Sequence, residues 1–109
     1  MRSDPTERLV GMLGLAMRAG KVIVGTDMVC VALGKRGKVR LAVLSDGASE
    51  QTKKKVSVKC EFYGVPTVTV SIDTAELGRL LGKTYGPACV GITDENFALE
   101  IAKCVSPHN

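Results

Sequence analysis

Apolar residues recur along the chain in two patterns, one typical of amphipathic helices and one of buried strands. Over residues 5–19 they return every three or four positions, which predicts a helix that begins after Asp4 and ends at Gly20. Short apolar or β-branched runs at 22–24, 41–44, 67–70 and 89–92 predict strands. Since the run Leu41-Ala42-Val43-Leu44 is apolar throughout, we expect it at the centre of a sheet that is covered on both faces.

Helix signals lie between these strands, so five helices are predicted to alternate with four strands. Ser49, Asp73 and Asp94 are placed to cap three of the helices, and Gly64 and Gly82 to end two of them. Alternation of this kind predicts one domain over residues 1–109. Its fold class would be α/β, a three-layer α/β/α sandwich with a four-stranded mixed sheet and helices on both faces. The order of the strands is not fixed by the pattern.

Composition narrows the class of protein. A chain of 109 residues with 45% apolar residues fits one folded domain and excludes a large multi-domain enzyme and a disordered tail. No apolar run approaches the ~18 residues needed to cross a bilayer, and no secretory signal begins the chain. We therefore expect a soluble, cytoplasmic protein that does not bind membranes. The cysteines, with no metal-ligand spacing, are expected as buried thiols, and disulfides are the alternative; they are Cys30, Cys60, Cys89 and Cys104.

Catalytic residue types are sparse. The only histidine, His108, is next to the last residue, where a fixed geometry is not expected. Four acidic residues near element ends could form a catalytic pair, namely Asp46, Asp73, Asp94 and Glu95, but Asp73 and Asp94 already have capping roles. Gly11 and Gly14 fall inside the first predicted helix, where close helix packing explains them better than a phosphate-binding loop. The sequence thus predicts no enzyme, no metal and no cofactor.

Positive charge is concentrated in one segment. Residues 21–40 carry the whole net charge of +4, with Asp27 as their one acidic residue. The helix that starts at Gly25-Thr26 offers free backbone N–H groups and the positive end of the helix dipole, which suits a phosphate. We expect Lys21 and the basic residues of 35–40 to flank that site. Two Tyr and two Phe do not indicate a stacking platform, so folded RNA is predicted rather than single strands.

Four segments carry a family resemblance: Gly20-Lys21-Val22-Ile23-Val24-Gly25-Thr26, the strand and loop over 41–49, Val65-Pro66, and Glu76-Leu77-Gly78-Arg79-Leu80-Leu81-Gly82. In this order, over residues 7–105, the chain resembles the kink-turn RNA-binding ribosomal-protein superfamily. Archaeal large-subunit protein seven-Ae, eukaryotic protein thirty-e and the small bacterial YlxQ-like proteins are members. The resemblance implies an α/β/α sandwich. It also implies an RNA site formed by the start of the second helix and the loop before the last strand.

Together with the basic cluster, the resemblance gives a set of candidate RNA-binding residues. They are Lys21, Gly25, Thr26, Asp27, Met28, Val31, Lys35, Arg36, Lys38, Lys83, Thr84, Tyr85, Gly86, Pro87 and Ala88.

The chain departs from the family at the start of this helix. The usual Gly-Thr/Ala-Asn-Glu-x-x-Lys pattern reads Gly25-Thr26-Asp27-Met28-Val29-Cys30-Val31. An ionised Asp27 cannot donate a hydrogen bond, and it repels phosphate. Met28 and Val31 stand where the family has Glu and Lys, and their side chains can neither accept nor donate as those residues do. Three interpretations stay open: a different RNA motif, affinity that rests on the Gly25 backbone and basic neighbours, or a surface that binds protein.

We therefore expect a non-catalytic RNA-binding protein of the translation or ribosome-assembly apparatus. RNA is its expected partner, with ribosomal or translation-factor proteins as further candidates, and a monomer its expected state. The alternative is a protein-interaction adaptor on the same fold that has lost kink-turn recognition. Met28 and Val31 would then form an exposed apolar stripe. An enzyme for a small anionic substrate is a third candidate, and it would need a concave pocket lined by polar groups.

Overall fold

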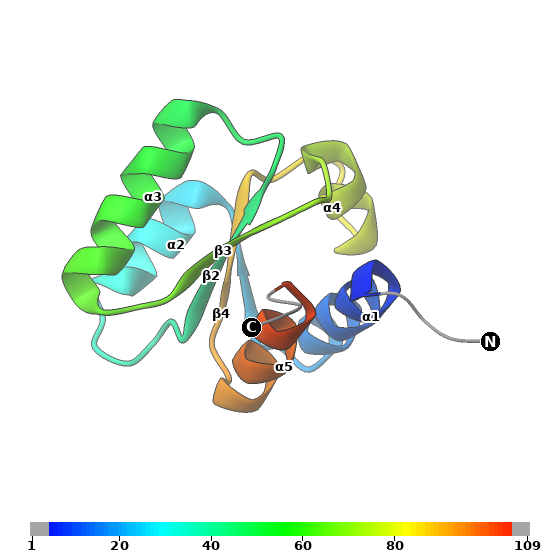
Figure 1. Cartoon of the computed structure of the whole chain (residues 1–109), viewed down its shortest axis with the longest axis horizontal. Coiled ribbons are helices and arrows are strands. Elements are labelled where there is room, and N and C mark those ends of the chain that lie inside the picture. Colours follow the sequence, from blue (N-terminus) through cyan, green and yellow to red (C-terminus); the bar gives the residue numbers. More distant parts are fainter. Residues whose placement is uncertain (1–4, 106–109) are drawn as a thin grey trace.

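A computed structural model describes residues 5–105 of the chain, and side chains from residue 7 onward. Helices and strands alternate in the predicted order (Figure 1). The elements are α1 (Pro5–Arg18), β1 (Val22–Val24), α2 (Thr26–Leu33), β2 (Leu41–Ser45), α3 (Glu50–Tyr63), β3 (Thr67–Val70), α4 (Thr74–Leu80), β4 (Cys89–Ile92) and α5 (Glu95–Val105). The expected cap Asp4, the end segment 106–109 and His108 lie outside the described residues.

The four strands form one mixed sheet in the order β1-β4-β2-β3. β4 runs antiparallel to both β1 and β2, whereas β2 and β3 are parallel and joined by the crossover helix α3. β2 is buried at all five positions, which confirms the prediction of a central strand. The C-terminal ends of β1, β2 and β3 therefore lie at the same edge of the sheet as the start of β4.

Helices cover both faces of the sheet and make a three-layer sandwich (Figure 1). On one face α1, α4 and α5 pack against Leu41 and Val43. On the other, α2 and α3 pack against Ala42 and Leu44. Successive β2 side chains serve opposite faces, as the pleat requires. The predicted fold class is confirmed.

Polar caps fix where three helices begin. The Ser49 hydroxyl oxygen accepts the Thr52 N–H at 3.1 Å. The Asp73 carboxylate accepts the Glu76 N–H at 2.8 Å, and the Asp94 carboxylate accepts the Phe97 N–H at 3.1 Å. Gly64, with φ of 70°, ends α3 in the left-handed conformation that favours glycine. These predicted boundaries are confirmed.

Two local predictions are wrong. A Cβ at Gly11 or Gly14 would meet no heavy atom within 4 Å, so close helix packing does not explain these glycines. Tyr63 shares a predicted apolar face with Val56 and Cys60, yet it is 44% exposed. It is the last residue of α3 and borders the turn at residues 34–37 instead of the sheet.

Three of the four cysteines are buried, as predicted. Cys30, Cys60 and Cys89 share the core beneath α2 and α3, and Cys104 is half-buried. All four are free thiols. Within residues 5–105, no helix is both long enough and apolar enough to span a membrane.

Candidate nucleic-acid interface

Backbone hydrogen bonds bring the start of α2 and the loop before β4 together. The Gly25 N–H donates to the Cys89 carbonyl oxygen at 2.9 Å, and the Ser45 N–H donates to the Ala88 carbonyl oxygen at 2.9 Å. Residues 25–28, 45–48 and 83–88 therefore lie at one edge of the sheet. The two segments that the family resemblance implies for an RNA site are neighbours in space.

The start of α2 is open. Its N-cap position is held by Gly25, which has no side chain to accept a first-turn N–H. Gly25 adopts φ of 105° and ψ of 143°, a conformation that other residues rarely adopt, and its carbonyl accepts the Val29 N–H at 3.0 Å. Side chains cap α3, α4 and α5. The first-turn N–H groups of α2 can therefore donate hydrogen bonds to an anionic ligand from solvent.

The cation beside this helix start comes from α3. Lys55 Nζ lies 3.7 Å from the Asp27 carboxylate, and both side chains are exposed. They line a shallow depression of about 470 Å³ with Thr26, Gln51 and Thr52. Lys55 is absent from the predicted site, because its place beside Asp27 depends on how α3 packs against α2.

The other predicted flanking cations lie elsewhere. The Lys21 carbonyl accepts the Thr93 N–H at 2.9 Å and the Arg40 N–H donates to the Ile92 carbonyl at 2.7 Å, so both residues lie at the far end of β4. The three residues of β1 separate Lys21 from Gly25, and each residue of a strand adds about 3.3 Å to that separation. The expectation that Lys21 flanks the start of α2 is wrong.

The same correction applies to the basic residues after α2. Lys35, Arg36 and Lys38 follow the C-terminal end of this eight-residue helix, which rises about 1.5 Å per residue. They therefore lie about 12 Å from its start, at the opposite edge of the sheet.

The loop before β4 is held tightly against α4. A Cβ at Gly78 would collide with the Tyr85 carbonyl oxygen, and a Cβ at Gly86 would lie 2.7 Å from the Thr74 carbonyl oxygen. The Lys83 N–H also donates to the Gly78 carbonyl at 2.8 Å. These contacts fix the backbone of the loop and leave the Tyr85 side chain exposed.

Two residues that shape this loop are absent from the predicted site. Gly78 gives it room, and Arg79 lines a depression of about 280 Å³ together with Lys83, Thr84 and Tyr85. Arg79 also pairs with Glu76 at 2.6 Å. Both Gly78 and Arg79 lie in the segment 76–82 that carries the family resemblance, and that segment is the sequence signal that could have identified them.

The side chains that depart from the family pattern are on the surface. Met28 is 60% exposed and Val31 is 61% exposed. The core residues of α2 are instead Val29, Cys30, Ala32 and Leu33. The apolar stripe on α2 is therefore available to a partner.

Comparison with known proteins decides the family. Residues 7–102 match the model of the Ribosomal protein L7Ae/L30e/S12e/Gadd45 family. The chain belongs to this family. It is 41% identical over 87 residues to the RNA-binding protein YlxQ of Bacillus subtilis, covering 80% of this chain and 84% of that protein. The Enterococcus faecium RNA-binding protein YlxQ is 35% identical over 98 residues, covering 90% and 91%.

Solved structures of family-like folds agree with this assignment. A Bacillus halodurans protein of unknown function superposes with a TM-score of 0.83 at 33% identity, covering 91% of this chain and 97% of that one. The Giardia lamblia 15.5 kD RNA-binding protein superposes with a TM-score of 0.77 at 17% identity, covering 98% and 89%. The second likeness concerns the fold alone.

Proposed function

We propose that the protein is a non-catalytic RNA-binding protein of the translation or ribosome-assembly apparatus. It would recognise a kink-turn-like folded RNA through the start of α2 and the loop before β4. One observation carries the proposal: the open, uncapped start of α2 lies beside a loop whose backbone is fixed. The names of the Bacillus subtilis and Enterococcus faecium relatives support RNA as the ligand.

Backbone groups make the main contact in this proposal. The first-turn N–H groups of α2 would donate to phosphate or base-edge oxygens, with the hydroxyl of Thr26 beside them. The loop residues 84–88 would pack against a nucleotide that is turned out of the stem. Lys55 and Lys83 would attract the backbone from either side of the helix start.

The altered residues change the balance of this interface. Asp27 presents a negative charge where the family has an amide, and the Lys55 ammonium at 3.7 Å offsets part of its repulsion of phosphate. Met28 and Val31 would add apolar contact but no hydrogen bond. Affinity would therefore rest on backbone N–H groups and nearby lysines more than on side-chain hydrogen bonds.

The test is a binding titration with two RNAs of equal length. One is a stem-bulge-stem with tandem sheared G·A pairs, and the other is a fully paired duplex. We expect tighter binding of the kinked RNA. Its affinity should fall steeply as salt is raised, because each lysine or arginine that neutralises a phosphate releases a counterion from the RNA. Equal affinity for the two RNAs, or no binding of either, would overturn the proposal.

A protein-interaction adaptor is the second candidate, and the exposure of Met28 and Val31 favours it. If α2 binds a protein, a partner captured from cell extract stays bound after nuclease treatment and is lost with Met28→Ser and Val31→Ser together. Capture that nuclease abolishes would exclude the adaptor.

A further inference from the structure

Two aromatic rings are exposed at the edge of the sheet opposite the start of α2. Phe62 is 79% exposed and Tyr63 is 44% exposed, and together they are half of the aromatic residues of the chain. Their ring centroids lie 4.9 Å apart with the planes at 90°. Phe62 is not among the residues that form the two core clusters or pack against them.

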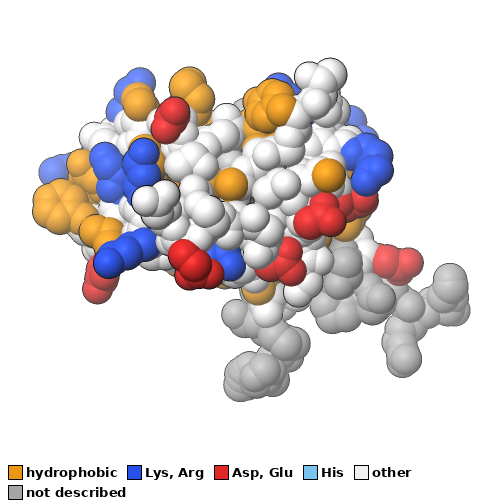
Figure 2. Space-filling view, turned by 90° about the horizontal axis from the view of Figure 1, so that it is seen from above, with side chains coloured by type: hydrophobic (Ala, Val, Ile, Leu, Met, Phe, Trp, Pro, Cys, Tyr) orange, Lys and Arg blue, Asp and Glu red, His pale blue; other side chains and the backbone are white. Residues whose placement is uncertain are grey.

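Basic side chains surround these rings. Lys59 Nζ lies 6.0 Å from the centroid of the Tyr63 ring. The turn after α2 adds Lys35, Arg36 and Lys38, all exposed, and residues 33–39 contain no acidic side chain. Glu61 is the acidic residue next to the rings in the sequence. In Figure 2 the end of the molecule formed by α2 and α3 shows lysine and arginine side chains interleaved with hydrophobic ones, and a few acidic side chains lie among them.

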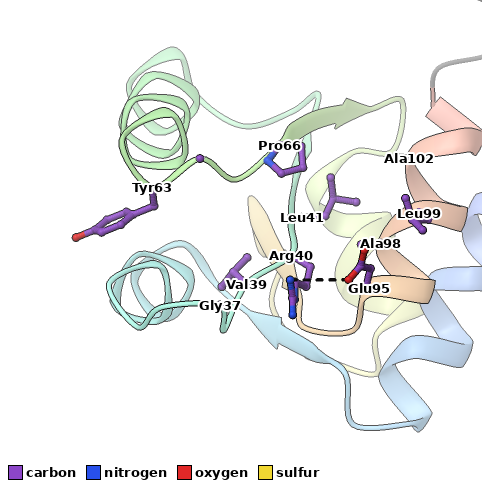
Figure 3. Close-up of a pocket in the computed structure, with 11 residues that line it drawn as sticks. Gly37, Val39, Arg40, Leu41, Tyr63, Pro66, Glu95, Ala98, Leu99 and Ala102 are labelled. Atoms are coloured by element: carbon purple, nitrogen blue, oxygen red, sulfur yellow. Dashed lines mark ion pairs between the residues drawn. The ribbon is translucent and has the colours of Figure 1, made fainter.

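The rings and the basic turn share one hollow. Arg36, Phe62 and Tyr63 line a depression of about 330 Å³, with the backbone of Gly34 and Gly37 at its side. Figure 3 shows the Tyr63 ring directed away from a second depression, between β2 and α5, so the ring does not fill that space. There Arg40 pairs with Glu95 at 3.9 Å, which leaves residues 35–38 as the source of positive charge beside the rings.

We propose that this aromatic–basic surface, formed by Lys35, Arg36, Lys38, Lys59, Phe62 and Tyr63, binds unpaired RNA nucleotides. Bases would stack on Phe62 and Tyr63, and the phosphates would lie against Arg36 and the lysines. Exposed aromatic rings between cations are the combination by which proteins hold single strands, because every base has a face that stacks. An acidic protein segment would be attracted by the charge but would not need the rings.

The inference goes beyond the proposed function, because binding here needs no kinked RNA. It also departs from the expectation that so few aromatic residues form no stacking platform, because two of the four lie together on one surface. The surface lies at the C-terminal end of α2, about 12 Å from the open start of that helix. A single RNA that carries a folded motif and an unpaired flank can therefore reach both ends of α2.

The test uses a fluorescently labelled, unstructured RNA of about ten uridines, a length in the range of single-strand sites, and follows its anisotropy at low salt. We expect the wild-type protein to bind it and Phe62→Ala to weaken binding about tenfold, since loss of one stacking partner has this effect. Leu15→Ala is the matched control. Leu15 is also apolar, 48% exposed and on a helix, but α1 covers the other face of the sheet. It should leave the affinity unchanged.

Three results would overturn the proposal: no binding of the oligonucleotide by the wild-type protein, an affinity that Phe62→Ala leaves unchanged, or competition by a glutamate-rich peptide as effective as that by unlabelled RNA. The last result would mean that charge alone is recognised and that the partner is an acidic protein. The kinked stem without unpaired ends is titrated in parallel. Its affinity should not change with Phe62→Ala, which separates failure of this surface from failure of the start of α2.

Discussion

Gly78 of α4 lies against the carbonyl of Tyr85, so closely that no side chain fits between them. A second contact of this kind, between Gly86 and the Thr74 carbonyl, lies one turn earlier on the same helix. The loop before β4 is thus held by backbone packing on α4, while the Gly25–Cys89 hydrogen bond ties the start of α2 to the end of that loop. Both parts of the candidate interface are positioned by main-chain contacts.

Gly78→Ala tests this positioning. The added methyl group would collide with the Tyr85 backbone, so either the loop or α4 must move. We expect the free energy of unfolding to fall by about 1–3 kcal/mol, the usual effect of overpacking. Affinity for the kinked RNA should fall as well because the loop is displaced. Urea unfolding and an RNA titration measure the two effects.

Gly11→Ala is the matched control for that change. Gly11 is also inside a helix, but a Cβ there would meet no heavy atom within 4 Å. The free energy of unfolding should rise by about 0.5–1 kcal/mol, because alanine restricts the unfolded chain and favours the helix. If Gly78→Ala proved as stable as Gly11→Ala, the result would contradict the close contact between Gly78 and the Tyr85 backbone.

Thr26→Glu should move stability and RNA binding in opposite directions. A carboxylate in the first turn of α2 interacts favourably with the helix dipole, and we expect about 0.3–1 kcal/mol of added stability. The same charge repels phosphate, so affinity for the kinked RNA should fall about tenfold. Asn96→Glu, at the start of α5 on the opposite edge of the sheet, is the control and should leave RNA affinity unchanged. Equal effects of both variants would argue against a phosphate contact at α2.

Asp27→Asn should strengthen RNA binding several-fold. It removes a negative charge from the candidate interface, supplies a donor and frees Lys55 from its ion pair. Because that pair is exposed, the free energy of unfolding should change by less than about 1 kcal/mol. Glu100→Gln breaks a comparable pair with Lys103 at 3.5 Å on α5 and should not alter RNA affinity. Weaker RNA binding by Asp27→Asn would mean that the Asp27–Lys55 pair itself is part of the recognition surface.

Stability should fall at alkaline pH through the buried thiols. Burial raises the pKa of Cys89 from 9.0 to about 12, and the neighbouring Cys60 and Cys30 add to the shift. The thiol stays neutral in the folded protein but ionises near pH 9.0 when unfolded, so its contribution is complete below pH 9.0 and is lost as pH rises toward 12. We expect a loss of up to about 1 kcal/mol per pH unit in that window. Unfolding by urea at several pH values measures it.

Cys89→Ala is the control for the alkaline loss. Without this thiol, the free energy of unfolding should fall less steeply above pH 9.0 than in the wild-type protein, because other groups also titrate there. Identical slopes for the two proteins would contradict the assignment to Cys89.

Much of the fold was predictable because local signals agree with one another. The apolar run at 41–44 marked the central strand, and Ser49, Asp73 and Asp94 marked the starts of helices that they do cap. The strand order was not predictable, since it depends on contacts between segments far apart in the chain. Nor was the exposure of Tyr63, because helical periodicity does not show where α3 passes the end of the sheet.

The candidate site was predictable in its backbone but not in its charges. Gly25 and the loop at 83–88 are found together, as the family resemblance implies. Lys21 is near Gly25 in sequence but at the other end of β1, whereas Lys55 is distant in sequence and lies beside Asp27. Nearness in the sequence does not predict nearness in space here, because each strand or helix takes the chain from one edge of the sheet to the other.

The most direct test of the central claim is a map of backbone amide chemical shifts as a kink-turn RNA without unpaired ends is titrated into the labelled protein. We expect the largest changes on residues 25–28 and 84–88, at the open start of α2 and the loop beside it. Changes confined to residues 34–40 and 59–63, at the opposite edge, would contradict it.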